Sequence, residues 1–454
     1  MAGLLTARRV RRPSIFHHPA RVVVGGFGFA ILVGTLLLSL PVATTSGTSP
    51  GLMPALFTAT SAACVTGLVM VDTAAHWSVF GEIVIAALIK MGGLGIMTLA
   101  TLFTVLLARR LKLRTQMIAQ VETRAMNMSD VRRVVRNVVL FSLFCETVAG
   151  TILSVRFVVA YDEPVLRGAY LGFFHAISAF NNAGFALWPD GLIRFAADPW
   201  ICLTIAVAVI VGGLGFPVIF ELVRVWRHPG RWSVLTRITL FVTTVLLAGG
   251  TLVFLSAEWH NPKTLGALDD PGKLLAAFFT AVMPRSGGFN SIDIASMEPS
   301  SWLATELLMF IGGGSAGTAG GIKVTTFGLV VLIVWAEMRG ENHVNVGHRR
   351  LSSSVQRQAI VITAMSAALV AVSTYVLLVI SPHPLGEVLF EVVSATGVVG
   401  LSTGITADLP QAGQVLLLVL MFIGRIGPLT LGSALALKER TRRYELPEER
   451  VIVG

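Results

Sequence analysis

Charged residues are scarce in this sequence. Asp, Glu, Lys and Arg make up 13% of its 454 residues, whereas soluble globular proteins carry about 25%. Because the deficit extends over the whole length, a soluble enzyme with a single anchor is excluded, and most of the chain is expected to lie in lipid. A helix needs roughly 20 apolar residues to cross the bilayer core, and several segments meet that length.

Cysteine is scarce as well, with Cys64, Cys145 and Cys202 as the three residues present. Their spacings fit neither a metal site nor the disulfide framework of a secreted protein, so free thiols packed in an apolar core are the simpler interpretation. The nine histidines form no ligand-spaced cluster, and the phosphate-binding pattern GxxxxGK[ST] is missing. We therefore expect no enzyme activity and no organic cofactor.

The basic residues are concentrated in a few stretches. Of the 35 Lys and Arg residues, 26 lie in five stretches between apolar segments, as the positive-inside rule predicts for cytoplasmic loops and ends. These stretches are 1–21, 109–136, 222–237, 337–357 and 438–450. A nucleic-acid-binding protein would gather basic residues on a folded polar face, so no nucleic-acid partner is expected. The first apolar run is too long for a signal peptide and is interpreted as a span whose N-terminal side is cytoplasmic.

A unit of about a hundred residues occurs four times. Each unit has a long apolar segment, a half-length apolar segment, a glycine-bearing turn and a second long apolar segment. The first long segments are 22–43, 137–160, 236–256 and 358–380. The second long segments are 80–108, 199–226, 301–336 and 413–437. The predicted pore repeats are 22–108, 109–226, 227–336 and 337–437, and the second and fourth repeats include the basic links that precede them. A cytoplasmic N-terminus at 1–21 and a cytoplasmic C-terminus at 438–454 flank the repeats.

The four turns align with one another. Each contains a glycine followed by Leu or Phe, and these glycines are 117, 104 and 112 residues apart. The turns read Cys64-Val65-Thr66-Gly67-Leu68, Asn181-Asn182-Ala183-Gly184-Phe185, Arg285-Ser286-Gly287-Gly288-Phe289 and Val398-Val399-Gly400-Leu401. A glycine cluster predicts a break in each second long segment, at Gly92-Gly93-Leu94-Gly95, Gly212-Gly213-Leu214-Gly215, Gly312-Gly313-Gly314-Ser315 and Gly424-Arg425-Ile426-Gly427. One such cluster is typical of helix packing, whereas four in register indicate a repeat.

Non-helical turns at membrane depth predict a shared pathway. Such backbone is tolerated only where it is buried in protein or lines a cavity, so the four turns should converge on one axis. Their carbonyl oxygens can replace the hydration shell of an ion, and each preceding half helix directs its negative C-terminal end at the site. No acidic residue adjoins the turn glycines, which favours a weakly bound monovalent cation. The predicted fold is an all-α membrane protein with four tandem span–pore-loop–span repeats around a central pseudo-fourfold pore.

The turn sequences resemble a known family. The stretch from Thr60 to Leu68, with Asp72-Thr73 after it, resembles the first filter of the Trk/Ktr/HKT superfamily of potassium transporters, and the other turns resemble its second, third and fourth filters. The resemblance covers nearly the whole chain. Because the chain begins directly at the first repeat, it is more similar to KtrB than to the longer TrkH proteins. The resemblance implies a potassium-conducting membrane subunit of an uptake system in the bacterial inner membrane.

The resemblance also implies roles for individual residues. The K⁺-binding filter would comprise Val65, Thr66, Gly67, Asn182, Ala183, Gly184, Ser286, Gly287, Gly288, Val398, Val399 and Gly400. Glycine at position 67 favours potassium, since family members with serine there admit sodium; a Na⁺-permeable or Na⁺-coupled transporter is the alternative. Two departures stand out, because Ser286-Gly287 replaces an expected Thr-Ala, and Lys90 replaces an uncharged polar residue and has no partner that the sequence identifies.

The segment 312–325, which reads GGGSAGTAGGIKVT, predicts a loop inside the membrane. Six glycines in fourteen residues cannot form a stable continuous helix, so the segment is either a packing kink or, by resemblance, a gate beneath the filter. The gate residues would be Gly314, Ser315, Gly317, Thr318, Gly320, Lys323 and Arg425. A charge at membrane depth usually faces a cavity, so Arg425 is interpreted as a pathway charge, with an ion pair to Glu221 or Glu306 as the alternative.

Several assignments stay open. Asp72 either contacts ions or braces the first filter, or is a plain loop acid, whereas Arg285 and Asn290 are expected to brace the third turn. The resemblance further implies a homodimer with one pore per protomer, contact with membrane lipid and a cytosolic nucleotide-binding ring subunit of the KtrA/TrkA type. A secondary transporter with inverted repeats is the competing class, but all four units begin at the basic side, which favours a pore. Sodium coupling and the regulatory nucleotide are left undetermined.

Overall fold

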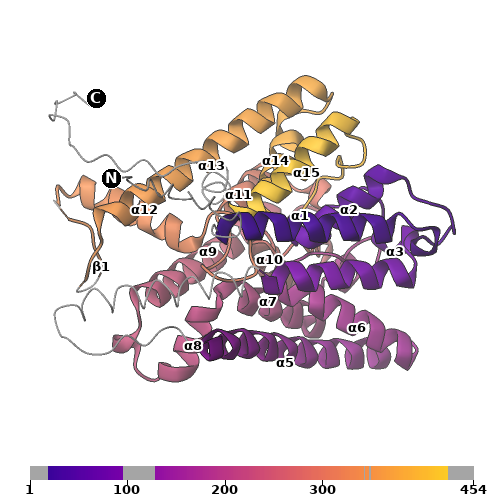
Figure 1. Cartoon of the computed structure of the whole chain (residues 1–454), viewed down its shortest axis with the longest axis horizontal. Coiled ribbons are helices and arrows are strands. Elements are labelled where there is room, and N and C mark those ends of the chain that lie inside the picture. The colour runs from indigo at the N-terminus through magenta and orange to yellow at the C-terminus, as the bar shows by residue number, and fades with distance from the viewer. Residues whose placement is uncertain (1–18, 96–127, 342, 347–348, 428–454) are drawn as a thin grey trace, which may run out of the picture.

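The computed structural model describes residues 19–95, 128–341, 343–346 and 349–427. Within them the chain is mostly helical (Figure 1), which agrees with the predicted helical membrane fold. One small exception is a two-stranded antiparallel hairpin, which was not predicted. The hairpin lies near one end of the molecule in Figure 1, and helix α3 lies near the opposite end.

The helices and strands follow one another in four groups. The first group is α1 (Pro19–Leu38), η2 (Pro41–Ala43), α2 (Leu52–Cys64), α3 (Thr73–His76) and a helix over 79–95. The second is α5 (Met128–Tyr161), α6 (Val165–Phe180), η3 (Ile193–Phe195), α7 (Pro199–Leu214) and α8 (Phe216–Val225). The third is η4 (Pro229–Arg231), α9 (Val234–Glu258), η5 (Leu265–Ala267), α10 (Asp270–Val282), η6 (Ile294–Ser296), α11 (Pro299–Phe310) and α12 (Val324–Met338). The fourth is β1 (Asn345–Val346), β2 (Arg349–Arg350), α13 (Ser353–Ile380), α14 (Leu385–Gly397) and α15 (Gln411–Ile426).

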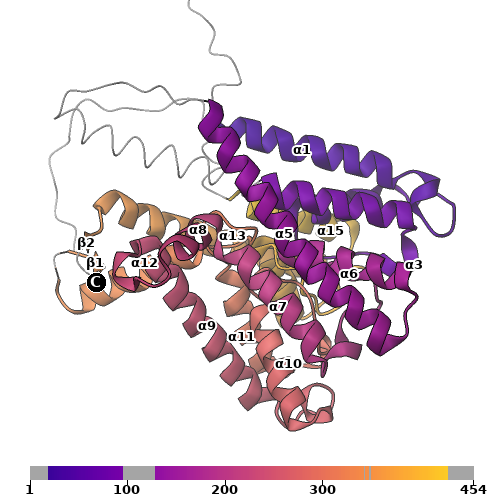
Figure 2. The ribbon, with the colours of Figure 1, turned by 90° about the horizontal axis from the view of Figure 1, so that it is seen from below.

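The four groups follow the same order of elements. A first helix is followed by a short helix of 13 to 16 residues, a non-helical turn and a further helix. The short helices pack against the group that precedes them: α10 against α7, α14 against α11, and α2 against α15. Because α2 belongs to the first group and α15 to the fourth, this last contact joins the last group to the first. In Figure 2, α9, α10 and α11 form a corner on the side away from α1.

Three helices are long and apolar enough to cross a membrane, judged by length and composition among the described residues. They are Val135–Tyr161, Val234–Glu258 and Ser353–Ile380. The bent pair α7 and α8, whose axes differ by 99°, counts as a fourth if it is one span. The other predicted spans are shorter or interrupted in the described part, and residues 96–108 and 428–437 of two of them lie outside it.

The predicted breaks differ among the four groups. Helix α7 ends at Leu214 and α15 at Ile426, each followed by a glycine with positive φ. In the third group the break widens to a loop over 311–323, since α12 already begins at Val324. In the first group the helix continues through Gly92 and Gly93 to residue 95, just as α7 continues through Gly212 and Gly213, and the residues after 95 lie outside the described part.

Gly92 and Gly93 serve close packing instead of a break. A Cβ on Gly92 would lie 2.0 Å from the carbonyl oxygen of Ala63, and one on Gly93 would lie 2.1 Å from Oδ1 of Asn181. Atoms at such distances overlap, so only glycine lets the helix approach the first turn and the start of the second. The aligned Gly212 of α7 has the same role as Gly92, because a Cβ there would lie 1.9 Å from the carbonyl oxygen of Phe180.

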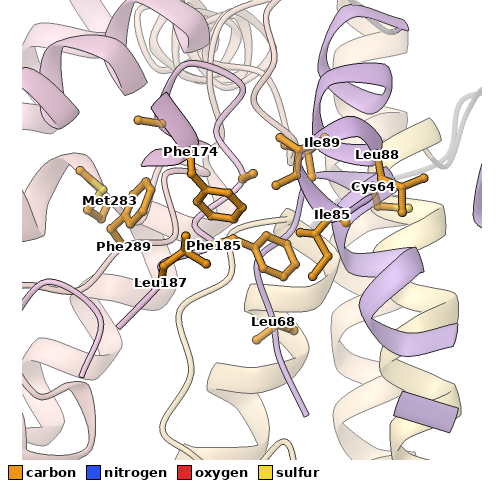
Figure 3. Close-up of a cluster of buried hydrophobic side chains, with 14 of the residues drawn as sticks. Cys64, Leu68, Ile85, Leu88, Ile89, Phe174, Phe185, Leu187, Met283 and Phe289 are labelled. Atoms are coloured by element: carbon orange, nitrogen blue, oxygen red, sulfur yellow. The ribbon is translucent and has the colours of Figure 1, made fainter. Parts of the chain in front are cut away.

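The residue after each turn glycine is an anchor in the hydrophobic core. Leu68, Phe185, Phe289 and Leu401 are all buried, and Figure 3 shows the first three within one cluster of apolar side chains. Since these anchors follow the turn glycines directly, packing of the core fixes where each turn lies. This explains why Leu or Phe occupies the position after the glycine in every turn.

Replacing Phe185 with alanine is expected to destabilise the folded protein by about 3–5 kcal/mol, the usual cost of truncating a buried Phe. Phe185 is 1% exposed, whereas Phe241 on α9 is 71% exposed and serves as the matched control. Thermal denaturation of the purified protein in detergent measures the effect. Equal denaturation temperatures for the two alanine variants would contradict the anchoring role.

Candidate functional site

The four turns share an unusual backbone conformation. Each has a glycine in the left-handed region, with φ of 92°, 71°, 74° and 97° at Gly67, Gly184, Gly288 and Gly400. Two positions earlier, each also has a non-glycine residue with φ between 56° and 68°; these residues are Val65, Asn182, Ser286 and Val398. Positive φ is a genuine outlier for a β-branched residue such as valine. Backbone strain of this kind persists only where the surroundings enforce it, and it clusters at functional sites.

Each turn is tied to the end of its own short helix. In the first, second and fourth turns, the amide before the glycine donates to the carbonyl five residues earlier, at 2.7 to 2.9 Å. These pairs are Thr66 to Ser61, Ala183 to Ser178 and Val399 to Ser394. In the third turn, Gly288 N donates to the Met283 carbonyl at 3.2 Å. The repeated hydrogen bond holds four separate segments in closely similar shapes.

The four turn glycines lie against one another in a closed ring. A Cβ on Gly67 would lie 3.2 Å from Cα of Gly184, and one on Gly184 would lie 2.7 Å from Cα of Gly288. A Cβ on Gly288 would lie 2.4 Å from the Val399 carbonyl oxygen, and one on Gly400 would lie 3.0 Å from Cα of Gly67. The chain order of the turns is thus their order around the ring, and no turn glycine can carry a side chain without displacing a neighbour.

The polar side chains among the other predicted filter residues are all buried. Ser286 Oγ donates to the Val398 carbonyl at 2.6 Å and so links the third and fourth turns. Asn182 Nδ2 donates to the Val209 carbonyl at 3.3 Å. Thr66 is fully buried, and its Oγ1 has no hydrogen-bond partner among the described residues. A buried, unpartnered hydroxyl beside the ring is a suitable ligand for a cation.

A cavity of about 180 Å³ adjoins the ring, and all four turn glycines line it. Asp72 and Asn290 line it too. Asp72 caps α3, because its Oδ1 accepts from the amide of Ala75 at 2.8 Å. The carboxylate therefore has a local structural role at the cavity's rim.

A second acid is held ionised in the loop beyond the second turn. Arg194 Nη2 lies 2.7 Å from Oδ1 of Asp190, and this hydrogen-bonded guanidinium lowers the pKa of the carboxyl below its usual value. Pro189 and Gly191, on either side of Asp190, line the same cavity. Because Arg194 balances its charge, Asp190 adds no net negative charge at the entrance to the ring.

The loop over 311–323 lies directly against two of the turns. Thr318 Oγ1 donates to Oδ1 of Asn182 at 2.6 Å, and the Gly320 amide donates to Oγ of Ser286 at 3.0 Å. The loop is also fixed to α7, because the amides of Gly314 and Thr318 donate to the carbonyls of Gly213 and Gly212 at 2.7 and 3.1 Å. Six predicted gate residues therefore lie in a segment that touches the second and third turns.

Two cationic side chains adjoin this loop. Arg425 is buried; Nη1 donates to the Thr318 carbonyl and Nη2 to the Gly92 carbonyl at 2.9 Å. In the described part of the chain Arg425 forms no ion pair with Glu221 or Glu306, and Glu221 instead accepts from Ser233. Lys323 Nζ donates to the Ala319 carbonyl at 2.6 Å. Backbone carbonyls of the loop and of the helix over 79–95 thus accept hydrogen bonds from both cationic groups.

Arg285 occupies the bracing position expected of it. Its Nη2 donates to Thr243 Oγ1 at 3.2 Å and reaches the Gly312 carbonyl at 3.5 Å. Sequence reasoning missed a similar brace at the fourth turn. Glu391 is fully buried and accepts from the Thr403 amide at 3.0 Å and Thr406 Oγ1 at 2.8 Å. The sequence indicated this brace only through an acidic residue inside the apolar half helix α14, because a buried carboxylate is almost always hydrogen-bonded.

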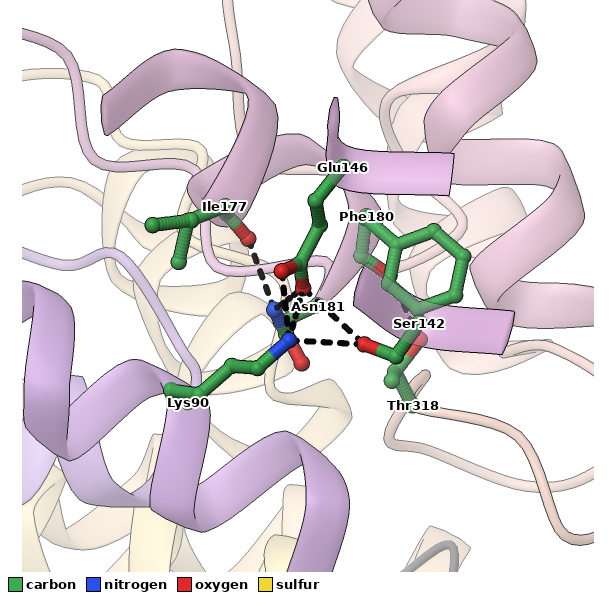
Figure 4. Close-up of polar contacts among 7 residues, drawn as sticks. All are labelled: Lys90, Ser142, Glu146, Ile177, Phe180, Asn181 and Thr318. Atoms are coloured by element: carbon green, nitrogen blue, oxygen red, sulfur yellow. Dashed lines mark hydrogen bonds and ion pairs between the residues drawn. The ribbon is translucent and has the colours of Figure 1, made fainter. Parts of the chain in front are cut away.

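Lys90 has a partner that sequence reasoning did not find. Its Nζ lies between Ser142 and Glu146 of α5, at 2.8 Å from Oγ of Ser142 and 2.5 Å from Oε1 of Glu146. Glu146 also accepts from Nδ2 of Asn181 at 2.9 Å (Figure 4). The available signal was that Lys90 and Glu146 each lie in a long apolar stretch, eight or more residues from the nearest other charged residue.

A family model described as TrkH, cation transport protein, matches residues 22–440. The chain belongs to the TrkH family. The Ktr system potassium uptake protein B of Bacillus subtilis (strain 168) is 40% identical over 437 residues, which cover 96% of this chain and 97% of that protein. The protein of the same description from Vibrio alginolyticus is 39% identical over 435 residues, covering 96% and 94%. The potassium/sodium uptake protein NtpJ of Enterococcus hirae is 33% identical over 442 residues, covering 96% and 97%.

The fold is also shared with a solved TrkH-family structure. The potassium transporter TrkH from Vibrio parahaemolyticus superposes with a TM-score of 0.71, at 17% sequence identity, over 91% of this chain and 85% of that one. Membership in the TrkH family makes the chain a transport protein and not an enzyme. Together with its long apolar helices, it makes the chain an integral membrane protein.

Proposed function

We propose that this TrkH-family chain is the potassium-selective, ion-conducting membrane subunit of a Trk/Ktr-type uptake system. The observation that carries the proposal is the closed ring of Gly67, Gly184, Gly288 and Gly400. The four groups of helices act as pore repeats around a pseudo-fourfold axis that passes through this ring. The repeat boundaries are those expected from the sequence, at 22–108, 109–226, 227–336 and 337–437.

In this proposal the ring is a selectivity filter. Carbonyl oxygens of the four turns replace the water around a dehydrated ion, and the buried hydroxyl of Thr66 is available as a further ligand. The turn glycines have no room for a side chain, so their backbones can approach one ion from four sides. The filter residues are those named from the sequence, from Val65 to Gly400.

Potassium is the preferred ion because Gly67 leaves the first turn free of a side chain. Two relatives at about 40% identity are named as potassium uptake proteins, which supports the same cargo here. A Na⁺-permeable or Na⁺-coupled transporter is the second candidate, because the relative from Enterococcus hirae is named as a potassium/sodium uptake protein. The chain holds no organic cofactor in either case.

The loop over 311–323 is the gate in this proposal. It lies against the turns through Thr318 and Gly320, and Arg425 holds it by the Thr318 carbonyl. The bound loop and the two cationic side chains, Lys323 and Arg425, obstruct cations on the inner side of the filter. Movement of the loop opens the path.

The assembly completes the proposal. The chain forms a homodimer with one pore in each protomer, lies in the bacterial inner membrane and keeps both termini in the cytoplasm. Its basic inner loops dock a cytosolic nucleotide-binding ring subunit, as the names of its Ktr-system relatives suggest for a multicomponent system.

Uptake of K⁺, Rb⁺ and Na⁺ into liposomes that hold the purified protein tests the function. K⁺ and Rb⁺ are expected to enter at least about tenfold faster than Na⁺, a ratio that corresponds to about 1.4 kcal/mol. Liposomes without protein give the background. Equal rates for the three ions would contradict potassium selectivity, and a variant without residues 314–320 distinguishes a closed gate from an absent pathway if nothing enters.

A further inference from the structure

A network of polar side chains connects the first and second groups of helices beside the second turn. It comprises Lys90 on the helix over 79–95, Ser142 and Glu146 on α5, and Asn181 at the end of α6 (Figure 4). Glu146 accepts from all three of the others: from Lys90, from Ser142 Oγ at 3.0 Å and from Asn181 Nδ2 at 2.9 Å. We call these four residues the brace.

The brace lies in an apolar setting. Only 5% of the Glu146 side chain and 22% of the Lys90 side chain are exposed. Charges at membrane depth are rare because they are costly there, and a buried ion pair is often no more stabilising than apolar side chains of similar volume. Stability alone therefore does not account for a pair that spans two groups of helices.

The brace acts on the second turn through Asn181. The Nδ2 of Asn181 donates to Glu146 and to the Ile177 carbonyl at 2.9 Å, while Oδ1 faces the backbone of Gly93. The Asn181 side chain is thus fixed by Glu146 of α5 on one side and packs against Gly93 of the first group on the other. It directly precedes Asn182, whose φ of 60° begins the strained part of the second turn.

The equivalent place between the third and fourth groups has no brace. Phe310 lies two residues before Gly312-Gly313, as Lys90 lies two residues before Gly92-Gly93. Gln358, Ile362 and Gly397 lie as far before Gly400 as Ser142, Glu146 and Asn181 lie before Gly184. Phe310, Gln358, Ile362 and Gly397 all line a cavity of about 290 Å³. The brace is therefore a feature of one contact between groups and not a requirement of the fold.

We infer that Lys90, Ser142 and Glu146 are positioning residues for the second turn and, through it, determinants of ion selectivity. This inference deepens the proposed function and rests on it. Glu146 is the central member, because its carboxylate accepts from Asn181, and Lys90 is the oppositely charged partner of that carboxylate.

Two double variants separate positioning from charge pairing. Lys90→Met with Glu146→Leu removes both charges and the acceptor for Asn181, whereas Lys90→Met with Glu146→Gln removes both charges but keeps a carbonyl oxygen for Asn181. The first is expected to lower the K⁺ to Na⁺ uptake ratio about tenfold, as loss of a partner behind a metal ligand typically does. The second is expected to stay within about twofold of the parent protein. Arg156→Met, which removes the 2.8 Å ion pair with Asp198 from the same helix α5, is the control and should leave the ratio unchanged.

Hydrogen exchange gives a readout that does not depend on transport. Amides of residues 182–185 should exchange about tenfold faster in the Lys90→Met, Glu146→Leu variant, with no change at the first turn. If that variant keeps both the parent ratio and the parent exchange, the brace is only structural and the inference is overturned. If the parent protein itself shows no K⁺ preference, the proposed filter fails, and exchange at 182–185 still decides whether the brace positions the turn.

Discussion

Replacing Gly67 with serine is expected to lower the preference for K⁺ over Na⁺ about tenfold. Gly67 has a φ of 92°, and a Cβ there would lie 2.3 Å from the carbonyl oxygen of Ala183. The serine must therefore either move the second turn or leave the left-handed conformation. An L-residue in that conformation costs roughly 1–2 kcal/mol of backbone strain. A change of about 1.4 kcal/mol in the free-energy difference between bound K⁺ and bound Na⁺ changes the selectivity ratio tenfold.

Gly51 provides a matched control for this substitution. It has a similar φ of 86°, but a Cβ there would meet only Cδ of Pro54 at 3.9 Å. Gly51→Ser therefore introduces the same strain without touching another turn, and the uptake ratio should not change. A folded Gly67→Ser protein with the parent's K⁺ preference would show that the first turn does not select ions.

The position of the turns could be predicted from the sequence, but their backbone could not. Glycine at regular intervals in apolar surroundings identifies all four turns, because few other residues tolerate such conformations. Positive φ at Val65 and Val398 has no such signal, since a β-branched residue disfavours it. The contacts between turns impose it, and those contacts join residues more than a hundred positions apart, as in the Ser286 hydroxyl on the Val398 carbonyl.

The glycine clusters show a second limit of sequence reasoning. Gly92-Gly93 and Gly212-Gly213 both lie inside helices, and the 99° bend of the second group comes two residues after Gly213, at Gly215. Glycine permits both a break and a close approach, so the neighbour decides. For Gly93 that neighbour is Asn181, which cannot be identified before the fold is known.

The partner of Lys90 illustrates the same point for charges. Glu146 lies 56 residues further along the chain, on a different long helix, so no helical spacing connects the two. Each lies in an apolar stretch, eight or more residues from the nearest other charged residue, and the cost of an unpaired charge in lipid indicates that both must be paired. That reasoning identifies a pair but not its attachment to Asn181, which requires the three-dimensional arrangement.

Removing residues 314–320 is expected to raise cation flux in the absence of any regulatory subunit by more than about tenfold. The deleted segment carries the loop's hydrogen bonds to both turns, through Thr318 and Gly320, and its contact with Arg425. The deletion leaves ends that already adjoin, because the Gly312 amide donates to the Ile322 carbonyl at 2.8 Å. Uptake into liposomes measures the flux.

A single substitution tests the same gate more gently. Thr318→Val keeps the shape of the side chain but removes the hydroxyl that donates to Asn182. One hydrogen bond contributes about 0.5–1.5 kcal/mol, so basal flux should rise about two- to tenfold. Thr251→Val is the control, since its hydroxyl donates to the Leu247 carbonyl of its own helix α9 and not to a turn. If the deletion lowers flux in a protein that remains folded, the loop supports the filter and does not obstruct it, and the gate must lie elsewhere in the chain.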